Sequence, residues 1–151
     1  MLNGFSPDSQ ITEELNSLLN NHQGLPAWEK IKDLPALKNW RGYKGRKLAA
    51  RLASALGNHR LSSIIDWKNW RENPDNDSAY FQALFSRLHF KAGSLLIPEM
   101  EKRLATIEQG QSVRSDLLGL IASCYSDIGE YSHAHRLLDE AMVDCKDPAW
   151  L

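Results

Sequence analysis

Residues 115–148, SDLLGLIASCYSDIGEYSHAHRLLDEAMVDCKDP, decide how the chain is expected to fold. Two segments with apolar residues every three or four positions, the spacing of one helix face, flank Gly129. The first segment places large, large, small and aromatic side chains at Leu118, Ile121, Ala122 and Tyr125. The second segment alternates small, large and small side chains at Ala134, Leu138 and Ala141. The pattern predicts two helices that approach closely at their small residues and are joined by a turn at Gly129.

This pattern resembles a tetratricopeptide repeat, a helix–turn–helix unit of about 34 residues that stacks on its neighbours. Two less regular copies are indicated upstream, over residues 43–76 and 78–111. Gly57 occupies the turn of the first of these copies, and Pro74 follows near its end. The resemblance implies an all-α, right-handed, TPR-like solenoid of about three helical hairpins. An unrelated all-helical bundle is the alternative.

The resemblance also implies a division of the chain into a cap and a repeat domain, because terminal repeats need a cap with a polar outer face. We expect an N-terminal helical cap over residues 1–42 and a TPR-like helical repeat domain over residues 43–151. The chain ends with DPAWL, at the point where a further repeat would begin. The repeat domain is therefore expected to continue beyond this segment.

Composition agrees with a globular helical protein. The chain has 151 residues, of which 42% are hydrophobic and 25% are charged, both ordinary fractions for a globular domain. It contains no sustained alternation of apolar and polar residues, so helices rather than strands are predicted throughout. The formal net charge of -1 gives no reason to expect global attraction to nucleic acid or to an anionic membrane.

Targeting signals and cysteine usage indicate a cytoplasmic protein. The N-terminal sequence MLNGFSPDSQ has neither a basic region nor an apolar core, so it does not read as a secretory signal. No apolar run approaches the roughly 20 residues that span a bilayer. Cys124 and Cys145 are too few to form the disulfide framework of a small secreted domain.

The residues that could carry chemistry do not form a recognisable catalytic or metal-binding pattern. His133 and His135 are two positions apart and point about 200° from each other on a helix, so they cannot share a metal ion. Cys124 and Cys145 do not add a zinc spacing, and Cys124 is expected to be a buried thiol. Phosphate-binding, dinucleotide-binding and hydrolase motifs are absent from the sequence. We therefore expect no enzyme activity, no cofactor and no metal site.

A basic segment provides the candidate binding site. Arg41, Lys44, Arg46, Lys47 and Arg51 place five positive charges within eleven residues. Lys44, Lys47 and Arg51 share one helix face, which the tetratricopeptide resemblance assigns to an inner groove that holds extended peptides. The equivalent positions of the later hairpins complete the predicted groove: Gln82, Ser86, His89, Asp116 and Ser123. This groove suits an acidic peptide or a terminal carboxylate, whereas the alternative is a solvated basic face without a ligand.

These features favour a non-catalytic module that binds a peptide or partner protein through a concave helical groove, whose basic residues suit an acidic partner. The alternative is the N-terminal regulatory or recruiting region of a larger enzyme whose catalytic domain lies beyond residue 151. Nucleic acid is an unlikely partner, because five positive charges in a chain of net charge -1 form a small electrostatic footprint. Self-association through the uncapped C-terminal helices, residues 131–151, is a further possibility.

Overall fold

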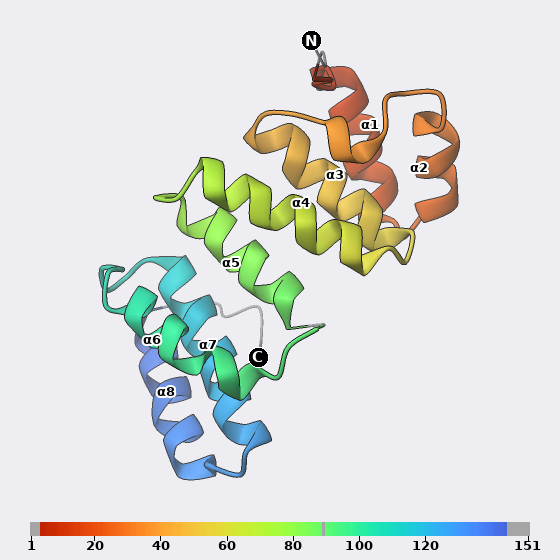
Figure 1. Cartoon of the computed structure of the whole chain (residues 1–151). Helices are drawn as coiled ribbons and strands as arrows, with labels where there is room; N and C mark the ends of the chain where they lie inside the picture. Colours follow the sequence, from red (N-terminus) through yellow and green to blue (C-terminus); the bar gives the residue numbers. More distant parts are fainter. Residues whose placement is uncertain (1–3, 89, 145–151) are drawn as a thin grey trace. The chain divides into compact units, whose positions relative to one another are not determined.

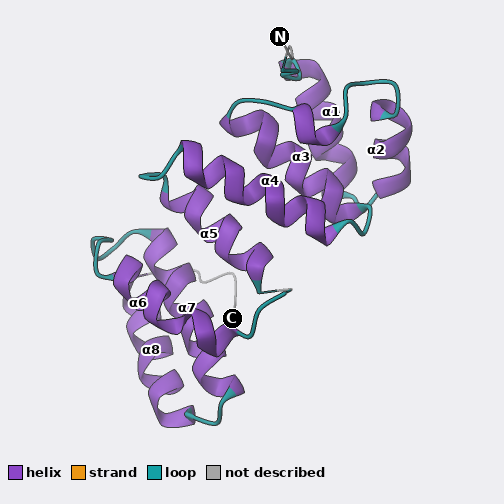
Figure 2. Ribbon diagram, viewed as in Figure 1, coloured by secondary structure: helices purple, strands orange, loops and turns teal. Residues whose placement is uncertain are grey.

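The computed structural model describes residues 4–88 and 90–144, and this part of the chain is all-helical, as predicted. Figure 1 labels the helices along the chain, and Figure 2 shows that helices and loops make up the described residues. The α-helices are α1 (Ser9–Asn20), α2 (Gly24–Ile31), α3 (Tyr43–Ala55), α4 (His59–Glu72), α5 (Asp77–Arg87), α6 (Ile97–Leu104), α7 (Ser112–Asp127) and α8 (Tyr131–Asp144). Two 3-10 helices, η1 (Leu37–Asn39) and η2 (Gly93–Leu96), interrupt the loops. An isolated parallel bridge joins Phe5 to Trp40.

The helix ends follow from local side-chain chemistry. Asp8 caps α1, because its Oδ1 accepts the N–H of Ile11 at 2.8 Å. Asn58 and Asn76 cap α4 and α5 in the same way. The turns predicted at Gly57 and Gly129 are confirmed: both glycines have positive φ angles, 82° and 85°. This left-handed conformation ends a helix without steric strain only where there is no Cβ.

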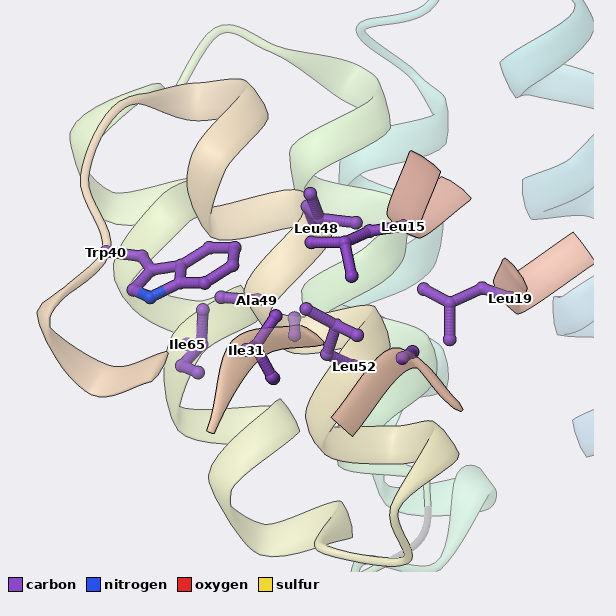
Figure 3. Packing of buried hydrophobic residues seen from close by; sticks show 10 residues of the cluster. Leu15, Leu19, Ile31, Trp40, Leu48, Ala49, Leu52 and Ile65 are labelled. Carbon is purple, nitrogen blue, oxygen red and sulfur yellow. The ribbon is translucent and has the colours of Figure 1, made fainter. Parts of the chain in front are cut away.

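The chain forms two compact units, Met1–His89 and Phe90–Leu151. The core of the first unit contains residues of α1, α2, α3 and α4 together with Trp40, the residue that follows η1. Several of these residues are shown in Figure 3. Its largest buried side chain is Trp40, whose indole N–H donates to the carbonyl of Pro35 at 2.9 Å. Segments from both sides of the predicted boundary at residue 42 thus share one hydrophobic core.

Helix α4 has an unusual buried face, because that face is largely polar. Ser62, Asp66 and Asn69 are buried on it, next to Ile65. The Asn69 amide donates to the backbone carbonyl of Tyr43 at 3.2 Å, and therefore joins α4 to the first residue of α3. Helix α4 packs against α3 on one side and α5 on the other. Buried polar groups require such partners, because an unpaired one is costly.

The second unit contains η2, α6, α7 and α8. Helices α7 and α8 form its most extensive contact and constitute the hairpin predicted over residues 115–148, as far as it is described. Ala122 of α7 and Ala134 of α8 are both buried, as the close approach requires. At the far end of the pair, the Ser115 hydroxyl donates to the carbonyl of Ala141 at 3.0 Å. The final residues of the predicted hairpin and the DPAWL sequence lie outside the described residues.

The middle hairpin differs in detail from the prediction. The predicted copy spans residues 78–111, but α5 ends at Arg87, and α6 runs only from Ile97 to Leu104. The backbone at Ala92 has ψ 129°, outside the helical region, and the 3-10 turn η2 follows it. Pro98 lies in the first turn of α6, where its missing N–H costs little. Helix α5 belongs to the first unit and α6 to the second, so their pairing in one hairpin stays a prediction.

The packing of α7 on α8 predicts that Ala134→Leu will destabilise the second unit. Extra methyl and methylene groups at a buried helix contact force neighbouring side chains to shift, which costs about 1–3 kcal/mol of unfolding free energy. His135→Leu is the matched control, because His135 is the next residue and is exposed. Chemical denaturation followed by circular dichroism should show the loss for Ala134→Leu alone. Equal stability of the two variants would contradict this helix register.

Candidate functional site

The first unit contains a cavity of about 360 Å³ between α3, α4 and α5, which we call the groove cavity. Its lining residues come from one face of each helix: Lys47, Ala50, Arg51 and Ser54 from α3, His59, Ser62 and Asp66 from α4, and Gln82, Phe85 and Ser86 from α5. The i, i+3, i+4 and i+7 spacing on α3 is the spacing of one helix face, so regular helix geometry alone aligns these four residues.

Four of the eight predicted groove residues are brought together here: Lys47, Arg51, Gln82 and Ser86. Lys44 is exposed at the start of α3 and is not among the residues that line the cavity. Asp116 and Ser123 lie on α7 in the second unit, and both residues are exposed. The neighbouring atoms remove part of the solvent around the Asp116 carboxyl group, which raises its pKa. His89 lies outside the described residues.

Arg51 is held in place by helix α1. Its guanidinium donates to Oδ1 of Asn16 at 3.0 Å and to Oδ1 of Asn20 at 2.5 Å. These neutral amides orient the guanidinium without cancelling its charge, and its fork geometry suits a carboxylate. One turn away, the ammonium of Lys47 lies 6.0 Å from the ring centroid of Tyr43. The α3 wall of the groove cavity is therefore positively charged.

Asp66 adds a negative group that the sequence analysis did not identify. Its side chain is almost fully buried, at 7% exposure, and its Oδ2 accepts a hydrogen bond from the Ser86 hydroxyl. Burial raises the pKa of Asp66 above its usual value of 3.8, although the Ser86 hydrogen bond partly offsets this effect. A carboxylate has lone pairs for several donors, so Asp66 can also accept N–H groups of a ligand in the cavity.

A periodic signal for Asp66 is present in the sequence. Ser62, Asp66 and Asn69 follow each other at i, i+4 and i+7, which is the spacing of one helix face. The apolar residues of the same segment do not mark its inward face, because some of them, such as Ile64 and Trp67, are exposed. A polar row at helical spacing was therefore the better indicator of the inward face of α4.

The remaining polar groups that line the cavity are hydrogen-bond donors and acceptors. The Ser54 hydroxyl lies 3.4 Å from Nδ1 of His59, and Ser62 is buried beside them on α4. Together with Gln82 they provide hydrogen-bonding groups between the positive wall and Asp66. This combination can bind a ligand that carries a carboxylate and several N–H and carbonyl groups.

Other groups considered in the sequence analysis have structural surroundings. Cys124 is buried as predicted, and burial together with Asp127 raises the pKa of its thiol. The ring of His133 packs 4.2 Å from that of Tyr125, centroid to centroid. Within residues 4–88 and 90–144, no three His, Cys, Asp or Glu side chains are grouped so that they could hold a metal ion. Cys145 is not among the described residues.

None of the helices that the structure describes has the length and apolar character required to cross a bilayer. No protein-family model matches the chain, and no curated protein and no solved structure matches it significantly.

The burial of Asp66 predicts a pH-dependent effect of Asp66→Asn. The raised pKa means that ionised Asp66 opposes folding at neutral pH, whereas below pH 3.8 the group is protonated in both the folded and the unfolded chain. Asp66→Asn should therefore raise the free energy of unfolding at pH 7, and the gain should vanish as the pH falls through the raised pKa towards 3.8. Urea denaturation at several pH values measures this difference.

Asp75→Asn serves as the control, because Asp75 is exposed and its replacement should not stabilise the chain at pH 7. A loss of stability for Asp66→Asn at pH 7 that disappears in acid would show that the ionised carboxylate is favourable in the fold, contrary to this assignment.

Proposed function

We propose that this chain is a TPR-like helical-repeat module that binds an extended acidic segment of a partner protein in the groove cavity and carries out no reaction on it. The observation that carries the proposal is the meeting of Lys47 and Arg51 with Gln82 and Ser86 in one cavity. Lys47 and Gln82 are 35 positions apart, and so are Arg51 and Ser86. This offset is close to one tetratricopeptide repeat, which supports equivalent inner faces on α3 and α5.

The chemistry of the groove cavity supports a peptide as ligand. An extended peptide presents backbone N–H and carbonyl groups along its length, and Gln82 can donate to one and accept from the other. An acidic side chain of the same peptide can pair with Arg51 and Lys47, while Asp66 accepts an N–H group. Charge-assisted hydrogen bonds of this kind provide specificity as well as affinity.

In this proposal the hairpins form a right-handed solenoid with an N-terminal cap. The proposed location of the protein is the cytoplasm. The α3–α4 and α7–α8 pairs support the hairpin unit. The proposed self-association through residues 131–151 has a partial basis in α8, where Tyr131, Met142 and Val143 are exposed. Exposed apolar residues on one helix are also compatible with a further repeat, which would bury them.

Selection from a random peptide library displayed on phage tests the proposed function. We expect the whole chain to enrich peptides with two or more Asp or Glu residues. A Lys47→Glu/Arg51→Gln variant should bind the enriched peptides about ten-fold more weakly, because it loses two cationic contacts. The glutamine at position 51 retains donors for Asn16 and Asn20. Fluorescence anisotropy with a labelled enriched peptide measures the affinity.

Arg60→Glu is the matched control, since Arg60 is an exposed cation of α4 that does not line the groove cavity. Enriched peptides without acidic residues, or equal weakening by the control and the double variant, would overturn the proposed ligand and site.

A further inference from the structure

A second cavity of about 360 Å³ lies in the first unit and is lined mainly by cations. Its charged residues are Lys38, Arg41, Arg46, Lys68 and Glu72, so four positive charges surround one carboxylate. They come from the segment around η1, from α3 and from α4, and none of them lines the groove cavity. We call this cluster the basic pocket.

The basic pocket contains an ion pair between a mostly buried arginine, Arg46, and an exposed carboxylate, Glu72. The Arg46 side chain is only 13% exposed, and its guanidinium pairs with the Glu72 carboxylate. The pKa of Glu72 is lowered chiefly by this hydrogen bond and further by the charges of Arg46, Arg41 and Lys68. Arg41, Arg46 and Lys68 thus line one cavity with Glu72, and all three favour the charged form of its carboxylate.

The N-terminal segment positions Arg41. The Phe5 N–H donates to the carbonyl of Asn39 at 3.2 Å, and the Arg41 N–H donates to the carbonyl of Phe5 at 2.8 Å. The Phe5 ring packs on Trp40 with 5.3 Å between ring centroids. These contacts place Gly4 directly against the Arg41 side chain: a Cβ at residue 4 would lie 1.8 Å from Cδ of Arg41. Glycine at this position thus leaves the space that the arginine side chain occupies.

The basic pocket is lined by four positive charges and one negative charge, and Glu72 is paired with Arg46. Like charges that lie close together repel one another. A doubly charged anion would relieve this repulsion, and guanidinium groups bind the oxygens of phosphate in a bidentate manner. We propose that the basic pocket binds a phosphate monoester, carried by a small molecule or by a phosphorylated side chain. This site is independent of the proposed peptide groove.

The shape and charge of the pocket favour a monoester over a phosphodiester backbone or a membrane surface. The Arg46 side chain is only 13% exposed, and Gly4, Asn39 and Trp40 line the same cavity, so a terminal phosphate can enter where a flat surface cannot. A diester carries only one negative charge per phosphate, whereas a monoester carries about two at neutral pH. The remaining cations of the 41–51 segment do not extend the pocket into a long basic track, because Lys47 and Arg51 line the groove cavity and Lys44 lines neither cavity.

Titration of the whole ¹⁵N-labelled chain with O-phosphoserine, followed by NMR at constant ionic strength, tests the proposal. The five tryptophans give separate indole N–H signals, and that of Trp40 should shift with saturation, together with the amides of Arg41 and Lys68. Inorganic phosphate should produce the same shifts, and the monoanionic diester dimethyl phosphate should bind at least ten-fold more weakly. Equal binding of dimethyl phosphate, or binding only to vesicles containing phosphatidylserine, would overturn the monoester assignment.

Two variants test the assigned residues. Arg41→Gln/Lys68→Gln should weaken O-phosphoserine binding about ten-fold or more, because two charge-assisted contacts are lost. Lys32→Gln/Arg60→Gln removes the same charge at exposed positions that line neither cavity, and it should leave the affinity unchanged. Gly4→Ala keeps every charge but displaces the Arg41 side chain, so it should also weaken binding, which a purely electrostatic attraction would not show. Non-saturating shifts in the unmodified chain, or equal weakening by both double variants, would overturn the site.

Discussion

The first unit depends on the burial of a polar helix face. Ser62, Asp66 and Asn69 lie on the side of α4 that faces its neighbours, and buried polar groups require hydrogen-bond partners. Asn69 meets this requirement at the start of α3, and Asp66 meets it through Ser86 of α5. Since these bonds are directional, they fix how α3 and α5 lie against α4 more narrowly than apolar packing alone. Two side chains of this row, Ser62 and Asp66, also line the groove cavity.

Helix geometry divides the basic segment between two cavities. Arg41, Arg46, Lys47 and Arg51 are close in sequence, but adjacent residues on a helix point about 100° apart. Lys47 and Arg51 therefore line the groove cavity, whereas Arg46 joins Arg41 and the distant Lys38 and Lys68 in the basic pocket. One cluster in the sequence becomes two sites of different chemistry: one includes a buried carboxylate, and the other is dominated by cations.

Features that depend on local chemistry could be predicted from the sequence. The helix cap at Asp8, the turns at Gly57 and Gly129, and Pro98 in the first turn of α6 each depend on residues close in the chain. The meeting of Lys47 and Arg51 with Gln82 and Ser86 was also predicted, from the repeat register. Asp66 was missed because an acidic residue inside a helix is usually solvated, and only contact with Ser86 and the surrounding helices shows that it is buried. The partners of Arg51, Asn16 and Asn20, were missed because they lie on α1, more than 30 positions earlier in the chain.

The sequence by itself determined that the described chain is helical, where the turns at Gly57 and Gly129 lie, and which residues share a helix face. These properties follow from periodicity and from capping interactions within a few residues. Only the tertiary structure decided that α4 buries a polar face, that Arg51 is held by Asn16 and Asn20, and that Gly4 lies against Arg41. Such contacts join residues 20 or more positions apart in the chain, and their partners depend on how whole helices pack.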